Sequence, residues 1–264
     1  MVSLSVVIPF FDEEENVVPL LEELEATLPS FAPDYEIVAV DDGSRDRTPA
    51  RLLDEAARRP RLRVLRFAAN AGQSAALAAG FRAARGDVAA TLDGDRQMDP
   101  RDLRALLERL AVGDVDLVYG RRARRADGSV RRWSTRVANA VRDRLTGDRV
   151  ADTGCPLKAF RRETLERLAP MLRWNGAHRF LVTLARMEGF RAAEIEVSHR
   201  PRVAGRSKYG VWNRAFRGLR DCLGVGWMRA RRVDAEATEI APARAETVDA
   251  AARSAAGARR AEAR

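Results

Sequence analysis

Short apolar runs alternate with amphipathic stretches along the first 120 residues. Runs such as Leu4–Pro9 are continuous and rich in β-branched residues, which is typical of a strand covered on both faces. Amphipathic stretches place apolar residues three or four positions apart, which predicts helices. The pattern predicts strands at residues 4–9, 36–40, 62–67, 87–92 and 115–119, and helices at residues 13–28, 48–58, 73–85 and 100–110. Alternation with short links indicates an α/β fold with a mostly parallel sheet flanked by helices.

Two further amphipathic stretches, both flanked by arginines, follow beyond residue 120. Their apolar positions are Trp133, Val137, Val141 and Leu145, and then Trp212, Phe216, Leu219, Leu223 and Trp227. Basic amphipathic helices with tryptophan on the apolar face are typical of a membrane interface. Each stripe can instead pack on the sheet, with its arginines solvated.

These patterns divide the chain into three parts. We expect a sheet domain at residues 1–210, an amphipathic membrane-interface helix at 211–232, and a flexible tail at 233–264 that is rich in Ala, Arg and Glu. No apolar run approaches the roughly 18 residues of a spanning helix. We expect no secretory signal, because the first predicted strand begins where such a signal would lie. The two cysteines make no disulfide framework, so we expect a reducing cytosol.

Charge is distributed unevenly along the chain. Residues 1–118 carry 14 basic and 22 acidic side chains, whereas residues 119–232 carry 28 basic and 10 acidic ones. The basic part is expected to bind anions such as phosphates, an anionic membrane surface or nucleic acid. It lacks interleaved surface aromatics for base stacking, and the acidic front would repel a polyanion. Nucleic acid is therefore not expected as a partner.

Two carboxylates, one residue apart, follow the fourth predicted strand. In an extended backbone, Asp93, Asp95 and Gln97 would share one face, and Gly94 would let the backbone turn and a ligand approach. Three oxygen donors suit a hard divalent cation, which completes its shell with substrate phosphates and water. The same residues can instead form a solvated Asp-Gly turn. Polar clusters also follow the first two strands, and ligands of parallel sheets bind at this edge.

Seven segments of the chain carry a family resemblance in their order and spacing. They are Val7–Asn16, Val38–Thr48, Asn70–Phe81, Asp93–Gln97, Asp152–Arg162, Gly176–Leu181 and His199–Gly210. The chain thereby resembles family 2 glycosyltransferases of GT-A fold, and within them the polyprenyl-phosphate, dolichol-phosphate-mannose-synthase-like branch. The resemblance covers about residues 3–230 and implies a Rossmann-like sheet with C-terminal amphipathic helices. Asp12 and Gly94 are mild departures, because the family usually has Asn and often Ala there.

The resemblance implies a donor site for a nucleotide sugar. Pro9, Phe11 and Glu13 would border the nucleotide, and Asp42 would reach the base or ribose. Asp93, Gly94, Asp95 and Gln97 would line the diphosphate, with Asp93, Asp95 and Gln97 holding Mg²⁺ or Mn²⁺. Arg122, Arg202 and Lys208 would neutralise the phosphates. Instead of binding the nucleotide, Asp42 can belong to an Asp-rich turn at a helix entry. Glu13 can instead be one of the acidic residues that the helix dipole favours in a first turn.

Catalytic and acceptor residues follow from the same resemblance. Asp152 and Asp95 are the catalytic candidates, and His178, Arg179 and Ser207 are candidates for the acceptor site. A carboxylate can deprotonate an acceptor hydroxyl. A lipid phosphate, whose second pKa is about 6, is mostly ionised at neutral pH and hardly needs a base. Asp152 would then position the acceptor or balance nearby arginines.

The resulting hypothesis is a metal-dependent, inverting glycosyltransferase. It would move a sugar from a UDP- or GDP-sugar to a polyprenyl phosphate, as a peripheral enzyme at the cytoplasmic face of the membrane, without a transmembrane helix. The alternative is a related transferase that acts on a polysaccharide or glycolipid hydroxyl. The sequence leaves the sugar and the oligomeric state open.

Overall fold

The computed structural model describes residues 3–122, 140, 142–148, 150–201 and 211–233, with side chains described from residue 218 in the last range. Met1–Ala230 form one compact unit and Arg231–Arg264 form a second. All the helices and strands named below belong to the first unit.

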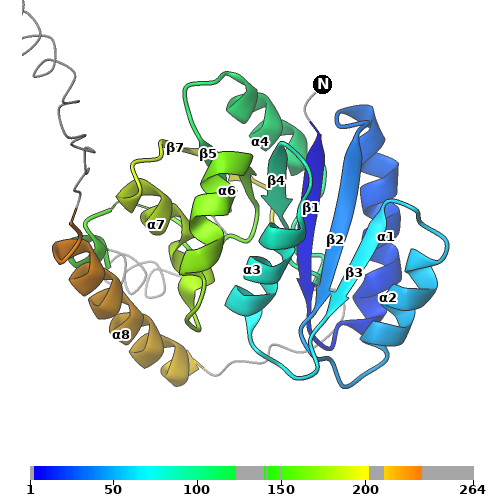
Figure 1. Ribbon diagram of the computed structural model, residues 1–264, viewed down its shortest axis with the longest axis horizontal. Helices are drawn as coiled ribbons and strands as arrows, with labels where there is room; N and C mark the ends of the chain where they lie inside the picture. The colour runs from blue at the N-terminus through cyan, green and yellow to red at the C-terminus, as the bar shows by residue number, and fades with distance from the viewer. Residues whose placement is uncertain (1–2, 123–139, 141, 149, 202–210, 234–264) are drawn as a thin grey trace, which may run out of the picture. The chain divides into compact units, whose positions relative to one another are not determined.

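A seven-stranded sheet with the order β3-β2-β1-β4-β6-β5-β7 runs through the first unit (Figure 1). The strands are β1 (Leu4–Phe10), β2 (Tyr35–Asp41), β3 (Leu62–Arg66), β4 (Val88–Thr91), β5 (Leu117–Arg122), β6 (Lys158–Arg161) and β7 (Ala192–Val197). The first four strands are mutually parallel where they pair, and β5 is parallel to β7. Strand β6 runs antiparallel to both of its neighbours. The prediction of a mostly parallel α/β sheet is confirmed.

Strand register brings the polar segments that follow β1, β2 and β4 to one edge of the sheet. Val7 of β1 lies opposite both Val38 of β2 and Thr91 of β4. The carboxyl ends of these three strands therefore lie side by side, at the edge opposite the N-terminus (Figure 1).

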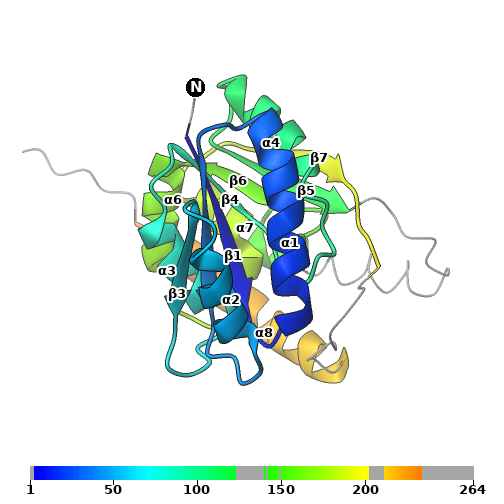
Figure 2. The same cartoon turned by 90° about the vertical axis from the view of Figure 1, so that its right-hand side faces the viewer.

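Helices cover both faces of the sheet, because successive strand residues point to opposite sides. One buried cluster includes Val6 and Ile8 of β1, and the other includes Val7. Helices α1 (Glu14–Thr27), α2 (Thr48–Ala56) and α4 (Asp102–Ala111) supply the first cluster, and α3 (Gln73–Ala83), α6 (Arg162–Leu168) and α7 (Leu181–Met187) supply the second. Figure 2 shows α1 and α3 on opposite sides of β1. The described residues also form short 3-10 turns: η1 (Leu28–Ser30), η2 (Ala169–Met171) and η3 (Ala177–Phe180).

Sequence periodicity located the early elements to within a few residues, but it missed several later ones. The five predicted strands and four predicted helices correspond to β1–β5 and α1–α4. We predicted no element at β6, α6, α7 or β7. Strand β6 has only four residues, and its pairing with β4 joins positions about 70 apart in the sequence, which a local pattern does not reveal.

The second amphipathic stretch forms α8 (Val211–Ala230), which confirms the predicted helix. Cys222 and Val225 of α8 are buried in the second cluster. Leu219, Leu223 and Trp227 are 45%, 54% and 63% exposed. Trp133, Val137 and Val141 of the first stretch lie outside the described residues, whereas residues 142–146 are helical. Among the described helices, none is both long and apolar enough to cross a membrane.

Candidate active site

The carboxylate pair lies on a turn after β4, and not on an extended strand as expected. Strand β4 ends at Thr91, and Arg96 adopts a φ of 58°, in the left-handed region. The Asp95 carboxylate accepts a hydrogen bond from the backbone N–H of Gln97 at 3.1 Å, which closes an Asx turn. Asp95 is buried and Gln97 is half-buried. The turn, rather than strand alternation, places the backbone of Gln97 against the Asp95 carboxylate.

Gly94 lies in the turn, as expected. It is absent from the positive-φ residues of the described chain, so close packing, rather than a left-handed conformation, is what requires a glycine here. A Cβ at this position would lie 2.6 Å from the Phe10 ring, which is fully buried at the end of β1. The glycine therefore lets the carboxylate turn lie directly on β1.

Asp42 at the end of β2 holds a neighbouring loop. Its carboxylate accepts hydrogen bonds from Asn70 Nδ2 at 2.9 Å and from the backbone N–H groups of Ala71 and Gly72 at 2.8 and 2.9 Å. Burial raises the pKa of Asp42 above its usual range, although these donors favour the charged form. Asp42 is 3% exposed, so the structure shows it as a clamp on the 70–72 loop at the predicted nucleotide site.

The loops after β1 and β2 are joined by hydrogen bonds at the same edge. The N–H of Asp12, which has a φ of 48°, donates to Ser44 Oγ, and the N–H of Glu13 donates to Thr48 Oγ1, both at 2.9 Å. Glu13 in turn accepts a hydrogen bond from Asn16 Nδ2 at 2.7 Å. The predicted nucleotide-bordering residues Pro9 and Phe11 are both half-buried here.

Asp152 forms a bidentate ion pair with Arg122. Arg122 Nε donates to Asp152 Oδ2 at 2.7 Å, and its terminal nitrogen donates to Oδ1 at 2.8 Å. Burial by itself would raise the pKa of Asp152, but the guanidinium holds it below its usual range. A carboxylate held in this way is a weak base. The pair brings together a predicted catalytic residue and a predicted phosphate-binding residue.

Lys158 is buried beneath the same edge, at the start of β6. Its ammonium donates to the carbonyl oxygen of Cys155. Desolvation lowers the pKa of Lys158, while the nearby charges of Asp93 and Asp152 favour the protonated form. The lysine therefore interacts electrostatically with both carboxylates.

The start of α3 connects the donor and acceptor sides. Gln73 Nε2 donates to Asp93 Oδ1 at 2.8 Å. Ser74 Oγ lies 2.9 Å from Nδ1 of His178, which is on η3. Burial, together with the Arg179 and Lys158 charges, lowers the pKa of His178 to about 3. Sequence reasoning assigned no role to Gln73, Ser74 or Lys158, although each lies within a motif segment.

Three predicted site residues, Arg202, Ser207 and Lys208, lie outside the described residues. The segment just before them is anchored beside the carboxylate turn. The N–H of Arg200 donates to the carbonyl oxygen of Gln97 at 2.8 Å, and its guanidinium pairs with Asp99 at 2.6 Å and Glu23 at 2.8 Å. Arg200 is thereby held next to Gln97.

The donor set suits a hard divalent cation that also binds substrate. Asp93 and Asp95 supply carboxylate oxygens, and Gln97 adds an amide oxygen. Within the part of the chain that the structure describes, no three His, Cys, Asp or Glu side chains form a complete metal site. Mg²⁺ typically takes only one or two carboxylates plus phosphates and water, so the residues present fit such an ion.

Comparisons with known proteins agree on one family. Residues 5–169 match the family described as Glycosyl transferase family 2. The chain is 37% identical over 226 residues to a dodecaprenyl-phosphate galacturonate synthase of Rhizobium johnstonii, covering 84% of this chain and 66% of that one. It is 42% identical over 210 residues to an undecaprenyl-phosphate 4-deoxy-4-formamido-L-arabinose transferase of Pseudomonas paraeruginosa, covering 79% of this chain and 60% of that one. The chain therefore spans about two thirds or less of these relatives.

Solved structures show the same fold. A mannosyltransferase from Pyrobaculum calidifontis, in complex with GDP-Man and Mn²⁺, has a TM-score of 0.62 at 24% identity and covers 90% of this chain and 66% of that one. Glucosyl-3-phosphoglycerate synthase from Mycobacterium tuberculosis, in complex with Mn²⁺, UDP and phosphoglyceric acid, has a TM-score of 0.63 at 20% identity and covers 88% and 80%. The fold is that of GT-A glycosyltransferases, and the chain belongs to glycosyl transferase family 2.

Proposed function

We propose that this chain transfers a sugar from a UDP- or GDP-sugar to a polyprenyl phosphate, with inversion at the anomeric carbon. The names of the two similar curated proteins support the polyprenyl-phosphate acceptor. A phosphate oxygen of the acceptor would form a bond to the anomeric carbon while the bond to the nucleoside diphosphate breaks. Residues 1–210 would carry out this reaction.

The observation that carries the acceptor class is the Asp152–Arg122 pair. An acceptor hydroxyl requires a base, whereas Asp152 is bound by a guanidinium at 2.7 Å and has a lowered pKa. An acceptor phosphate is already ionised at neutral pH. The pair therefore favours the lipid phosphate over the alternative, a polysaccharide or glycolipid hydroxyl.

On the donor side, we assign the diphosphate to the turn that carries Asp93, Asp95 and Gln97. Mg²⁺ or Mn²⁺ bound there would neutralise the charge that develops on the leaving nucleoside diphosphate. Arg122, Arg202 and Lys208 would add positive charge around the phosphates. Pro9, Phe11 and Glu13 would border the nucleotide. Asp42 would contact the nucleotide through the loop that it clamps.

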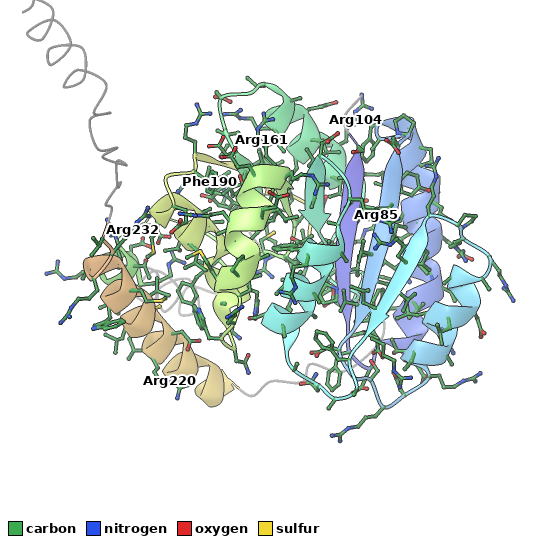
Figure 3. All side chains as sticks on the ribbon, in the orientation of Figure 1. Arg85, Arg104, Arg161, Phe190, Arg220 and Arg232 are labelled. Carbon is green, nitrogen blue, oxygen red and sulfur yellow. The ribbon has the colours of Figure 1, made fainter. Side chains whose placement is uncertain are left out.

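On the acceptor side, we assign the lipid phosphate to His178, Arg179 and Ser207. We also propose that residues 211–232 hold the protein at the cytoplasmic face of the membrane. The exposed apolar stripe of α8 supports this placement, and Arg220 lies at the surface of the same helix (Figure 3). Arginines beside an apolar stripe suit an anionic lipid surface.

The test is a transfer assay with the purified chain, a short-chain polyprenyl phosphate, Mn²⁺ or Mg²⁺, and a panel of UDP- and GDP-sugars. D95N is the site variant. D54N is the matched control, because Asp54 is an exposed carboxylate on α2. We expect metal-dependent transfer that falls at least about 100-fold in D95N and is unchanged in D54N.

The corresponding polyprenol, which lacks the phosphate, distinguishes the two acceptor classes. Transfer to polyprenyl phosphate but not to polyprenol would support the proposal. Transfer to the free alcohol would favour the hydroxyl-acceptor alternative. If no donor supports transfer although the lipid is shown to bind the protein, the proposed activity is refuted.

A further inference from the structure

The first two residues of α3 face different parts of the site. Successive residues of a helix are rotated by about 100°, so Gln73 and Ser74 can contact separate partners. Gln73 contacts Asp93 after β4, and Ser74 contacts the segment that begins η3. Asp42 binds the N–H groups of Ala71 and Gly72 immediately before the helix, which fixes where α3 begins.

Gln73 restricts the orientation of a carboxylate assigned to the metal. Its amide nitrogen donates to Asp93 Oδ1 at 2.8 Å, which is a normal hydrogen-bond distance. Amide donation to one oxygen fixes the rotation of the carboxyl group without adding charge. Groups that orient metal-binding side chains commonly change affinity by about 10- to 100-fold when they are removed.

Ser74 determines which nitrogen of His178 carries the proton. The backbone N–H groups of Gly176 and His178 both point to Ser74 Oγ at 3.2 Å. A hydroxyl has one proton and two lone pairs, so two accepted hydrogen bonds leave its proton to donate. The remaining partner is Nδ1 of His178, at 2.9 Å. Nδ1 is then an acceptor, and the proton of the neutral ring lies on Nε2.

The surroundings favour this neutral ring. Ser74 is 2% exposed, which makes the hydrogen bonds hard to replace with water. The charged groups that act on the ring are Arg179 on η3 and Lys158 on β6, and both are cations. The carboxylate of Asp221 on α8 lies close to Gly176, where a Cβ would approach it to 2.8 Å. Asp221 is not among the groups that shift the pKa of His178. Burial and the two cations lower the pKa of His178 to about 3.

We propose that Gln73 and Ser74 are positioning residues: Gln73 orients Asp93, and Ser74 holds His178 as a neutral ring whose Nε2–H is a fixed hydrogen-bond donor. The clamp by Asp42 sets both contacts at once. One short stretch of α3 thus aligns the donor and acceptor sides of the site. The link to sugar transfer rests on the proposed function, whereas the two contacts do not.

Nitrogen-15 NMR of the histidine rings tests the Ser74 contact without any substrate. The chain contains two histidines, so H199Q leaves the His178 ring signals alone. We expect a single tautomer at pH 7, with Nε2 protonated and Nδ1 unprotonated. S74A in the same background should show exchange between tautomers. A protonated ring or an Nδ1–H tautomer in the protein with Ser74 would overturn the inference.

Mn²⁺ binding tests the Gln73 contact. Titrations are followed by electron paramagnetic resonance, with UDP and with GDP in separate experiments. We expect Q73A to bind Mn²⁺ about tenfold more weakly than the unmodified chain. R82A is the control, because Arg82 is an exposed residue near the other end of α3. Equal affinities in Q73A and the unmodified chain, or no measurable binding to either, would overturn this half of the inference.

Activity then distinguishes failure of this inference from failure of the proposed function. If transfer occurs, Q73A should shift the metal concentration needed for half-maximal rate. S74A should lower kcat by about tenfold and leave that metal concentration unchanged. If no transfer is found while the NMR and Mn²⁺ results hold, the proposed function fails and the two contacts stand.

Discussion

At the scale of single residues, neighbouring groups determine what a carboxylate can do. Asp42, Asp93, Asp95 and Asp152 all follow strands or precede turns, and the sequence alone does not reveal their hydrogen-bond partners. In the structure, Asp42 clamps a loop, Asp95 closes a turn and Asp152 pairs with Arg122. The chemistry of each follows from its hydrogen-bond donors, which lie up to 30 residues away in the sequence.

Replacement of Asp152 by Asn tests its role in the proposed reaction. We expect D152N to lower transfer about tenfold rather than abolish it, because the loss is one charge-assisted contact to Arg122. The lowered pKa of Asp152 means that it stays ionised throughout the neutral range. The ionisation of Asp152 should therefore cause no change of the transfer rate between about pH 5.5 and 8. Steady-state rates of both proteins across that range provide the measurement.

Complete loss of turnover in D152N would contradict this prediction and support a general base. R122K is a useful companion variant, since lysine keeps the charge but cannot form the bidentate pair. If the pair matters mainly by geometry, R122K should lower the rate about as much as D152N.

At the scale of elements, α8 has two different faces. Cys222 and Val225 are buried against the sheet domain, and Gly226 lies against the carbonyl of Leu145, where a Cβ would approach to 2.5 Å. The outward positions Leu219, Leu223 and Trp227 recur every four residues, so they form one stripe along the helix. The helix thus packs on the sheet domain through one face, as one of the two alternatives expected, and it exposes an apolar stripe on another face.

The exposed stripe predicts how the protein binds vesicles. We expect L223S/W227S to reduce binding to vesicles of equal amounts of phosphatidylglycerol and phosphatidylcholine by at least about tenfold, since two apolar side chains no longer enter the lipid. L53S is the matched control, because Leu53 of α2 is 59% exposed but lies outside the stripe. Co-sedimentation gives the bound fraction. Equal binding by the two variants would refute the assignment of this face to the membrane.

At the scale of the whole molecule, the half-buried ring of His178 links stability to pH. Its ordinary pKa of 6.5 falls to about 3 through burial, with further lowering by Arg179 and Lys158. Between these two values the unfolded chain binds a proton that the folded protein does not bind. The free energy of unfolding therefore decreases as the pH falls from about 6.5 towards 3.

This dependence predicts a loss of about 2 kcal/mol of stability from His178 between pH 7 and pH 5. Urea denaturation at both pH values measures it. H178N is the control, since its side chain does not titrate and its carbonyl oxygen can still accept from Ser74. The decrease in the free energy of unfolding should be about 2 kcal/mol smaller in H178N. An equal decrease in both proteins would contradict the neutral, half-buried ring.

Much of the fold could be predicted from the sequence, because its determinants are local. Periods of apolar residues determined β1–β5, α1–α4 and the existence of α8. Turn-forming carboxylates after the strands indicated the edge at which the candidate site is expected, since parallel strands end on the same side. Neither inference depends on contacts between distant segments.

Tertiary structure alone decided the position of β6 and the partners of the site residues. Strand β6 inserts between β4 and β5 through hydrogen bonds to strands that precede it by about 40 to 70 residues. The contacts of Ser74 with His178 and of Arg122 with Asp152 span 104 and 30 positions. The sequence by itself therefore determined the earlier elements and indicated the edge at which the candidate site is expected. Only folding decided which polar groups meet there, because hydrogen bonding and burial depend on groups brought together from distant positions.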